Sequence, residues 1–249
     1  MPRVPDALVL CGGAGLRLRD VTGNGPKSMA TVAGRPFLNL LLKQLQRNGF
    51  ERIILAVGYQ RDAIQSYFGE LAHGLQLIYS VETSPLGTGG ALRNAADLVQ
   101  SDIVLITNGD SYADADLIRF VADLAESKAE ASMIVVPADG RSDGGSVVLD
   151  QSDRLMRLGE KQEPFGAQYL NAGIYLLSRD LLFDIPPRLQ LSLERELLPR
   201  WLKEGRYIKG FVHLGKCVDI GTPERYRNAQ DILVNAEARD ITLQGKAYL

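Results

Sequence analysis

The sequence predicts an α/β fold in which helices cover both faces of a doubly wound, mostly parallel central sheet. Up to about residue 110, short apolar runs alternate four times with amphipathic stretches. That alternation calls for parallel strands joined by helices. The second half contains more strand-like segments than helical ones. We therefore expect a Rossmann-like core followed by a small β-rich portion.

The first half begins with a strand expected at Ala7–Cys11, because this continuous apolar run ends at two glycines. A helix is expected over Pro36–Asn48, where leucines recur at helical spacing and Gly49 follows as a cap. The other expected elements are strands at Arg52–Val57, Leu75–Val81 and Asp102–Thr107, and helices at Gln60–Phe68 and Gly89–Leu98. On the helix at Gln60–Phe68, Ile64, Tyr67 and Phe68 are expected on one side.

The second half is less regular, with a turn cluster at Asp139–Gly145. Ser192 is expected to cap a helix that Pro199 interrupts, and Thr222 to cap the last helix. The other expected elements are a helix at Asp114–Glu126 and strands at Ala131–Pro137, Ser146–Asp150, Arg154–Gly159, Tyr169–Leu177, Arg206–His213 and Lys216–Ile220. No linker separates the halves, so we expect one domain over residues 1–249, with halves at about 1–130 and about 131–235.

Composition narrows the class of protein. The 249 residues are 45% hydrophobic and 23% charged, with a net charge of -2, so the chain resembles an ordinary globule. A charge this close to neutral provides no electrostatic footprint for nucleic acid or for an anionic membrane. Cys11 and Cys217 form no zinc or disulfide pattern, and the first apolar run is too short for a signal or a membrane span. We expect a cytoplasmic protein.

A glycine-rich loop follows the first strand. Gly12, Gly13 and Gly15 allow the backbone to turn sharply and present N–H groups to a polyanion. Arg17 and then Lys27 add cations suited to phosphate oxygens. The loop matches neither the dinucleotide fingerprint nor the P-loop. An ordinary turn with solvated cations is the alternative interpretation.

Two carboxylates follow strands. Asp110 comes just after the strand at Asp102–Thr107, where doubly wound folds bind ligands, and Asp219 follows a late short strand. Two such carboxylates can hold one Mg²⁺. Each could instead belong to a turn or a cap. Asp114 and Asp116 form a DxD pattern, but they lie where a helix should begin.

Three further segments are candidates for binding. The loop Glu82–Gly90 offers glycines for close approach to a flat base and a helix N-terminus beside them, although it could simply cap that helix. Glu160-Lys161 ends a strand, and a solvated surface lysine is the alternative there. Asn171-Ala172-Gly173 interrupts an apolar strand, as a plain bulge also would.

The order of these motifs resembles the sugar-1-phosphate nucleotidyltransferases, whose signature is GGxGTRL followed by PK. Here the chain reads GGAGLRL and then Pro26-Lys27. Within the family, the chain is most similar to the D-glycero-D-manno-heptose 1-phosphate guanylyltransferases, over Ala7 to about Asp231. Leu16 stands where the family usually has Thr, and Ser28 where Pro is common. The missing Thr hydroxyl bears on one side-chain contact to the phosphates, and the backbone cradle is kept.

The resemblance implies a magnesium-dependent reaction between a nucleoside triphosphate and a sugar 1-phosphate. The implied catalytic residues are Arg17, Lys27, Asp110 and Asp219, with Asp110 and Asp219 as metal ligands. The implied nucleotide-binding residues are Leu10, Gly12, Gly13, Gly15, Arg17, Lys27, Glu82, Gly87, Thr88 and Asp110. The implied sugar-phosphate-binding residues are Asn108, Gly109, Glu160, Lys161, Asn171 and Gly173. The first half would bind the nucleotide and the second half the sugar.

The expected reaction transfers GMP from GTP to D-glycero-D-manno-heptose 1-phosphate and releases pyrophosphate, making a nucleotide sugar for surface polysaccharide. Mannose 1-phosphate with GTP, or an amino-sugar 1-phosphate with UTP, stay open. More remote alternatives are a metal-dependent glycosyltransferase using Asp114 and Asp116, and a non-catalytic nucleotide-sugar sensor. Neither nucleic acid nor a membrane is an expected partner, and the oligomeric state is left open.

Overall fold

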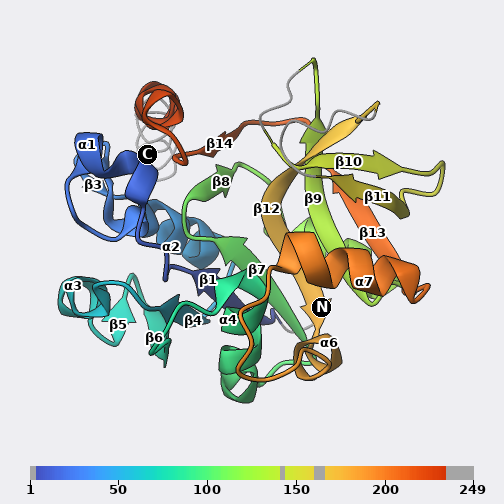
Figure 1. Ribbon diagram of the computed structural model, residues 1–249, viewed down its shortest axis with the longest axis horizontal. Helices are drawn as coiled ribbons and strands as arrows, with labels where there is room; N and C mark the ends of the chain where they lie inside the picture. The colour runs from blue at the N-terminus through green and yellow to red at the C-terminus, as the bar shows by residue number, and fades with distance from the viewer. Residues whose placement is uncertain (1–3, 141–143, 160–165, 234–249) are drawn as a thin grey trace, which may run out of the picture.

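The computed structural model describes residues 4–140, 144–159 and 166–233, and this part of the chain folds around one ten-stranded sheet (Figure 1). At its centre, β1 (Asp6–Leu10) pairs in parallel with β4 (Arg52–Val57) and with β7 (Ile103–Asn108). Next to β4 lies β6 (Leu75–Val81), again parallel. The order β6-β4-β1-β7 is that of a Rossmann-like, doubly wound half, so the predicted fold class is confirmed.

Antiparallel strands from the second half extend this sheet. β12 (Tyr169–Ser178) runs antiparallel to β7 and connects the parallel part to the β-rich part. β12 also pairs with β9 (Ala131–Pro137) and β10 (Ser146–Leu149). Beyond them, β11 (Leu155–Gly159) pairs with β10, and β13 (Ile208–Val212) pairs in parallel with β9. The smaller strands are β5 (Leu71–Ala72) at the far edge and the pairs β2 (Thr31–Val32) with β3 (Arg35–Pro36) and β8 (Ser111–Ala113) with β14 (Cys217–Asp219).

Helices cover both faces of the sheet, because alternate residues of each central strand point to opposite sides. In β1, Ala7 and Val9 belong to one buried cluster and Leu8 to the other. The first cluster includes side chains of α2 (Phe37–Arg47), α3 (Arg61–Phe68), α5 (Leu117–Glu126) and the last helix, residues 223–233. The second includes side chains of α4 (Gly87–Ala95), α6 (Arg179–Phe183) and α7 (Leu198–Lys203).

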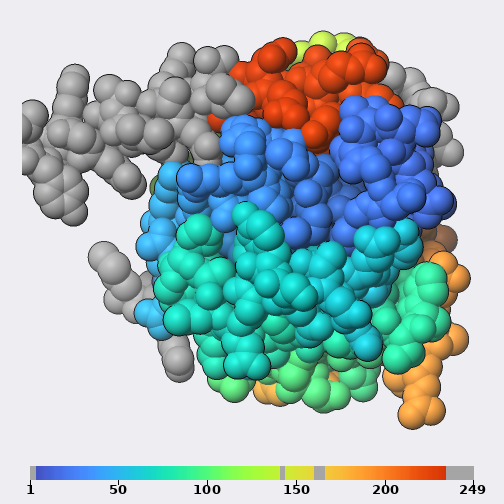
Figure 2. Space-filling view, turned by 90° about the vertical axis from the view of Figure 1, so that its left-hand side faces the viewer, coloured from blue at the N-terminus to red at the C-terminus, as the bar shows by residue number. Residues whose placement is uncertain are grey.

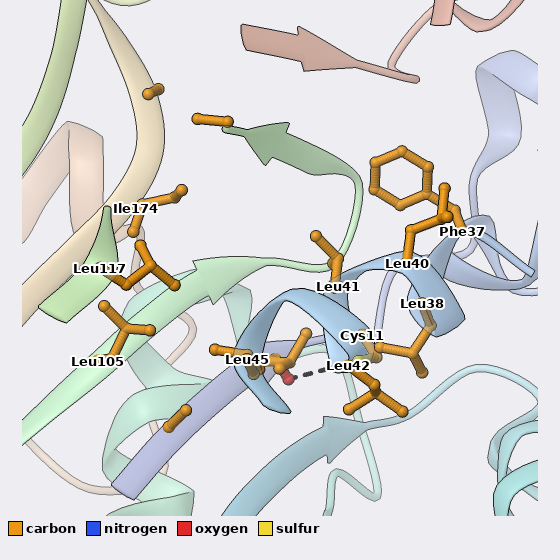
Figure 3. Close-up of a cluster of buried hydrophobic side chains, with 14 of the residues drawn as sticks. Cys11, Phe37, Leu38, Leu40, Leu41, Leu42, Leu45, Leu105, Leu117 and Ile174 are labelled. Atoms are coloured by element: carbon orange, nitrogen blue, oxygen red, sulfur yellow. Dashed lines mark hydrogen bonds between the residues drawn. The ribbon is translucent and has the colours of Figure 1, made fainter. Parts of the chain in front are cut away.

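The leucine pattern of α2 forms the centre of the first cluster. Figure 3 shows Leu42 and Leu45 gathered beside Cys11, with Leu41 close by. These leucines are at most 2% exposed. Burying a side chain of this size contributes about 2 kcal/mol, so the sequence periodicity directly reflects what holds α2 on the sheet.

Most predicted boundaries agree with the structure, and the differences have local causes. The helix predicted from Asp114 begins only at Leu117, because Ser111–Ala113 forms β8 and Asp116 caps α5 by accepting from the Arg119 N–H at 2.9 Å. Of the residues expected on one side of α3, Ile64 is buried, whereas Tyr67 is 55% exposed.

The predicted interruption near Pro199 is also present. Ser192 caps a single π-helical turn, η4 (Leu193–Leu197), by accepting from the Arg195 N–H, and Pro199 then lies in the first turn of α7. Short π turns of this kind are frequent at functional sites. None of the described helices has the length and apolar character needed to cross a membrane.

The last helix returns to the N-terminal half. Its Gln230 side chain donates to the Thr31 carbonyl at 2.8 Å and accepts from the Ala33 N–H at 3.2 Å, which fixes it on the β2-β3 hairpin. Figure 2 shows the red C-terminal segment against the blue N-terminal one. The segment that carries Asp219 is therefore held near the glycine-rich loop.

Candidate active site

A cavity of about 700 Å³ lies at the carboxyl ends of the parallel strands. The ends of β1, β4, β6 and β7 all contribute to it, as expected of the crevice in a doubly wound sheet. Its volume suits a ligand of nucleotide size. The predicted nucleotide-binding residues that line it are Leu10, Gly12, Gly13, Lys27, Glu82, Gly87, Thr88 and Asp110.

The glycine-rich loop passes over Lys27. Gly15 has a φ of +59°, and a Cβ there would lie 3.0 Å from the Lys27 Cβ, so a side chain would be strained and crowded. At the other end of the loop, a Cβ on Gly12 would lie 2.8 Å from the Glu82 Oε1 atom. These glycines let the loop sit close to both a cation and a carboxylate at the cavity.

Lys27 and Asp110 form an ion pair at this cavity. The Lys27 Nζ donates to the Asp110 Oδ2, and both side chains are partly buried. The two residues come from different elements, since Lys27 begins η2 (Lys27–Met29) and Asp110 follows β7. The structure therefore unites the predicted phosphate-binding lysine with the predicted metal-binding carboxylate.

Asp219 joins them through strand pairing. In the β8-β14 pair, Asp219 lies opposite Ser111, and the Ile220 N–H donates to the Asp110 carbonyl at 2.9 Å. A Cβ added at Gly221 would lie 2.7 Å from the Asp219 Oδ1 atom and 3.4 Å from the Lys27 Nζ atom, so both groups lie close to this glycine. The two carboxylates, more than a hundred positions apart in the sequence, thus flank one lysine.

The Asp219 carboxylate is held by its own partners. Its Oδ1 accepts from the Gly221 N–H at 2.7 Å, and its Oδ2 accepts from Arg225 at 2.6 Å. A carboxylate oxygen can accept more than one hydrogen bond or ligate a cation as well. Arg225, from the last helix, therefore orients Asp219 and leaves it capacity for a metal.

The carboxylates fit a magnesium ion. Among the residues that the structure describes, no three His, Cys, Asp or Glu side chains gather as a metal cage. Mg²⁺ does not require one, since it is usually bound by one or two carboxylates together with waters and substrate phosphates. Asp110 and Asp219 would supply the protein ligands, and the Lys27 ammonium would have to release Asp110.

Glu82 lies on another side of the cavity. Its Oε2 accepts from the Leu86 N–H at 3.2 Å, which orients the carboxylate. Burial raises the pKa of Glu82, and the Leu86 hydrogen bond lowers it by less. The arrangement leaves the other oxygen, beside Gly12, at the cavity, where a base with N–H groups could donate to it.

The loop after Glu82 packs closely against the second half. A Cβ added at Gly87 would lie 2.5 Å from the Leu191 carbonyl oxygen. One added at Gly89 would lie 2.5 Å from a Leu197 methyl group, and one at Gly90 would lie 2.4 Å from the Leu189 carbonyl oxygen. These glycines accommodate the segment 189–197, whereas the sequence suggested room for a base. Gly87 still lines the cavity.

The predicted sugar-phosphate residues divide into three groups. Asn108 and Gly109 line the cavity. Asn171 and Gly173 lie on β12 at a register shift, as a bulge would predict, and a Cβ on Gly173 would lie 2.7 Å from the Asn108 amide nitrogen. Glu160 and Lys161, with the rest of residues 160–165, lie outside the described residues, as do residues 141–143 of the predicted turn cluster.

Some predicted residues lie apart from the cavity. Arg17 is exposed on η1 (Leu16–Leu18) and does not line it. The Asp114 side chain lies elsewhere, with its Oδ1 paired to the His213 Nε2 at 2.7 Å. With Asp116 capping α5, the DxD pattern is used for local structure.

Among the side chains that line the cavity, Tyr59 and Gln190 were not predicted from the sequence. Tyr59 follows β4, so the rule that ligands gather at carboxyl ends of parallel strands could have found it. Gln190 has no local signal, since only the packing of Leu191 on Gly89, with an N–H···O distance of 2.8 Å, brings it there.

Comparison with known proteins identifies the family of the chain. Residues 6–235 match the family described as nucleotidyl transferase. The chain is 36% identical over 242 residues to a mannose-1-phosphate guanylyltransferase of Mycobacterium tuberculosis, covering 96% of this chain and 67% of that protein. It is 32% identical over 225 residues to the D-glycero-alpha-D-manno-heptose 1-phosphate guanylyltransferase of Aneurinibacillus thermoaerophilus, covering 90% and 96%.

Solved structures with a similar fold include HddC from Yersinia pseudotuberculosis, with and without a bound ligand. HddC from Yersinia pseudotuberculosis superposes with a TM-score of 0.81 at 30% identity, covering 92% of this chain and all of that one. HddC complexed with GMP-PN superposes with a TM-score of 0.80 at 31% identity and equal coverage. The likeness therefore spans most of this chain.

Proposed function

We propose that this chain, which belongs to the nucleotidyl transferase family, transfers a nucleoside monophosphate to a sugar 1-phosphate and releases pyrophosphate. The family and the guanylyltransferase relatives identify the enzyme class as sugar-1-phosphate nucleotidyltransferase. The predicted family resemblance is confirmed.

One observation carries the proposal for the site. Lys27, paired with Asp110 and flanked by Asp219, faces a cavity whose rim is a glycine-rich loop. A lone glycine loop or a lone acidic residue would suit many proteins. A phosphate-binding loop, a lysine and two metal-competent carboxylates around one point suit the transfer of a phosphoryl-linked group.

The chain's own residues act by binding and orientation. The sugar-phosphate oxygen attacks the α-phosphorus in line, and the oxygen that bridges to the β-phosphorus leaves with pyrophosphate. The attacking oxygen is already ionised, so the reaction requires alignment more than proton abstraction. Lys27 binds triphosphate oxygens, and the loop N–H groups of Gly12 and Gly13 direct the chain of phosphates into the cavity.

Members of this family generally use a divalent metal, and we propose Mg²⁺ held by Asp110 and Asp219. When bound, the ion would neutralise charge on the phosphates. Arg17 would bind the triphosphate, and Asn108, Gly109, Glu160, Lys161, Asn171 and Gly173 would receive the sugar phosphate. These assignments rest on motif position, and for Asn108 and Gly109 also on their place at the cavity.

GTP is the proposed nucleotide. Both curated relatives named above are guanylyltransferases, and HddC has been crystallised with GMP-PN. Guanine carries two adjacent N–H donors on one edge, N1–H and the N2 amino group. The oriented Glu82 carboxylate at the cavity is an acceptor suited to that edge.

D-glycero-D-manno-heptose 1-phosphate is the proposed sugar substrate. The heptose relative of Aneurinibacillus is matched over 96% of its own length, and HddC over all of its chain. Mannose 1-phosphate is the second candidate, because the Mycobacterium relative reaches 36% identity, although it has further sequence that this chain does not match.

The test is pyrophosphate release with Mg²⁺, crossing the four common nucleoside triphosphates with heptose, mannose and N-acetyl-amino-sugar 1-phosphates. We expect release only when GTP and a sugar 1-phosphate are both present, with heptose preferred, and loss of release with EDTA. Release of a nucleoside diphosphate from a nucleotide sugar would support a glycosyltransferase instead. Binding without turnover would support a sensor.

A further inference from the structure

A hydrogen-bonded chain of side chains runs from the nucleotide loop into η4. The Thr88 hydroxyl, at the start of α4, donates to the Glu194 Oε2 at 2.8 Å and accepts from the Leu193 N–H at 2.8 Å. The Ser192 hydroxyl donates to the same Glu194 oxygen at 3.1 Å. The Thr88 hydroxyl proton is therefore committed to Glu194, so toward a nucleotide this hydroxyl could only accept a hydrogen bond.

The chain continues from Glu194 to the sugar strand. The Tyr175 hydroxyl, on β12, donates to the Glu194 Oε1 at 3.0 Å and accepts from the Asn171 side-chain amide nitrogen at 2.8 Å. The Asn171 side-chain oxygen accepts from the Gly173 N–H at 2.8 Å. One glutamate thus contacts the loop that lines the nucleotide cavity and, through one tyrosine, the bulge of β12.

The Tyr175 hydroxyl links the hydrogen-bond direction set by Glu194 to the orientation of the Asn171 amide. Tyr175 is 1% exposed, and burial together with the Glu194 charge raises the pKa of its hydroxyl well above its ordinary value. The hydroxyl therefore keeps its single proton, which it directs at Glu194. Only acceptor capacity remains for Asn171, so the amide nitrogen of Asn171 must point toward Tyr175.

We infer that Glu194 is a positioning residue that orients the Thr88 loop and the Asn171 side chain together. This inference rests on the proposed function. A carboxylate can only accept hydrogen bonds, so it dictates the direction of every hydrogen bond in the chain. At one end Thr88 must donate, and at the other end the Asn171 amide is held in one of its two flipped orientations. The Asn171 oxygen accepts from the Gly173 N–H in that same orientation. The second amide hydrogen of Asn171 is then the donor left for the sugar 1-phosphate that we assign to this strand.

The experiment compares Glu194→Gln, Tyr175→Phe and Tyr207→Phe by steady-state pyrophosphate release, varying GTP and the sugar 1-phosphate separately. Glutamine keeps the size of Glu194 but can donate as well as accept, so the directions are no longer dictated. Tyr175→Phe breaks only the branch toward Asn171. Tyr207 takes no part in this chain of hydrogen bonds, and the centre of its ring lies 5.4 Å from the Arg154 guanidinium carbon. Tyr207→Phe is therefore the matched control.

We expect Glu194→Gln to raise KM for the sugar 1-phosphate about tenfold and KM for GTP about threefold, with kcat changed less. Tyr175→Phe should raise only the sugar KM, and Tyr207→Phe should change neither. Unchanged KM values in Glu194→Gln, or equal changes for both substrates in Tyr175→Phe, would overturn the inference while wild-type turnover upholds the proposed function. Should Tyr175→Phe fail to fold, Glu194→Gln alone decides. Absence of wild-type turnover would overturn both.

Discussion

Strand β1 has an ion pair near each of its ends, and the two pairs differ in what surrounds them. At the amino end, the Asp6 Oδ2 accepts from Arg52 at 2.8 Å and from the Gln100 N–H at 2.6 Å, and Asp6 is 7% exposed. At the carboxyl end, Lys27 and Asp110 pair at the wall of the cavity. The chemical groups are similar, but only one pair faces space that a ligand can occupy.

The difference follows from the geometry of a doubly wound sheet. At the amino edge, the segment that leads into β7 passes close to β1 and satisfies Asp6 with the Gln100 N–H. At the carboxyl edge, adjacent loops diverge and leave a crevice. A charge at the amino edge therefore stabilises the fold, whereas a charge at the carboxyl edge keeps capacity for a metal or a phosphate.

The largest expected effect comes from breaking the carboxyl-end pair with Asp110→Asn. We expect kcat/KM for pyrophosphate release to fall about 10³-fold, because the variant loses a proposed metal ligand. The measurement is steady-state turnover over a range of Mg²⁺ concentrations. Thermal unfolding serves as the control and should change little, since both partners are partly open to the cavity.

Turnover of Asp110→Asn within tenfold of the wild type at saturating Mg²⁺ would contradict this assignment. The two ends of β1 would then not differ in the way proposed here.

The next effect comes from breaking the amino-end pair with Asp6→Ala. We expect the free energy of unfolding to fall by about 3 kcal/mol, because Arg52 would be left partly buried and unpaired. Turnover at a temperature where the variant is folded should stay within about twofold of the wild type. Urea denaturation monitored by circular dichroism measures the stability.

Asp62→Ala is the matched control for that loss. Asp62 is 90% exposed and lies 3.6 Å from Arg61, so its removal should leave unfolding unchanged within error. A kcat loss in Asp6→Ala comparable to that in Asp110→Asn would erase the contrast between the two ends.

The smallest effect concerns Glu82, a carboxylate at the carboxyl edge that is oriented by a backbone N–H. Because burial raises its pKa, the folded state binds the proton more tightly than the unfolded state does. Its contribution to stability is therefore greatest at low pH and falls as pH rises through the folded-state pKa. Glu82→Gln does not titrate, so it should become more stable relative to wild type over that window.

Denaturation of both proteins between pH 4 and pH 8 tests this expectation, and a constant difference across the range would contradict it. At pH 7.5, the same variant should raise KM for GTP about tenfold, because one charged acceptor for guanine is lost. Ser84→Ala, another change at the cavity wall, is the control and should alter GTP binding less.

Local sequence patterns predicted the core and part of the site. The strands at Arg52–Val57 and Leu75–Val81 were predicted with their observed bounds, since apolar runs flanked by turns carry that information locally. The expectation that Asp110 would lie at the carboxyl edge was also correct in position, because any residue directly after β7 must lie there.

Other features had no local signal. Nothing near Asp114 indicated β8, whose partner β14 is about a hundred residues away. Glu194 was not singled out, because its partners Thr88 and Tyr175 come from distant segments. The glycines at 87, 89 and 90 suggested space for a ligand, whereas the segment 189–197 fills it.

The sequence by itself determined the core strands and the helices between them, the glycine-rich loop with Lys27, and the place of Asp110, because periodicity, turn residues and strand ends act over a few positions. Only the tertiary structure decided that Asp219 would flank Lys27 and that Glu194 would join the two halves of the site. Those contacts depend on strand pairing and helix docking between distant segments, and the free energy that selects them comes from burial of the whole core.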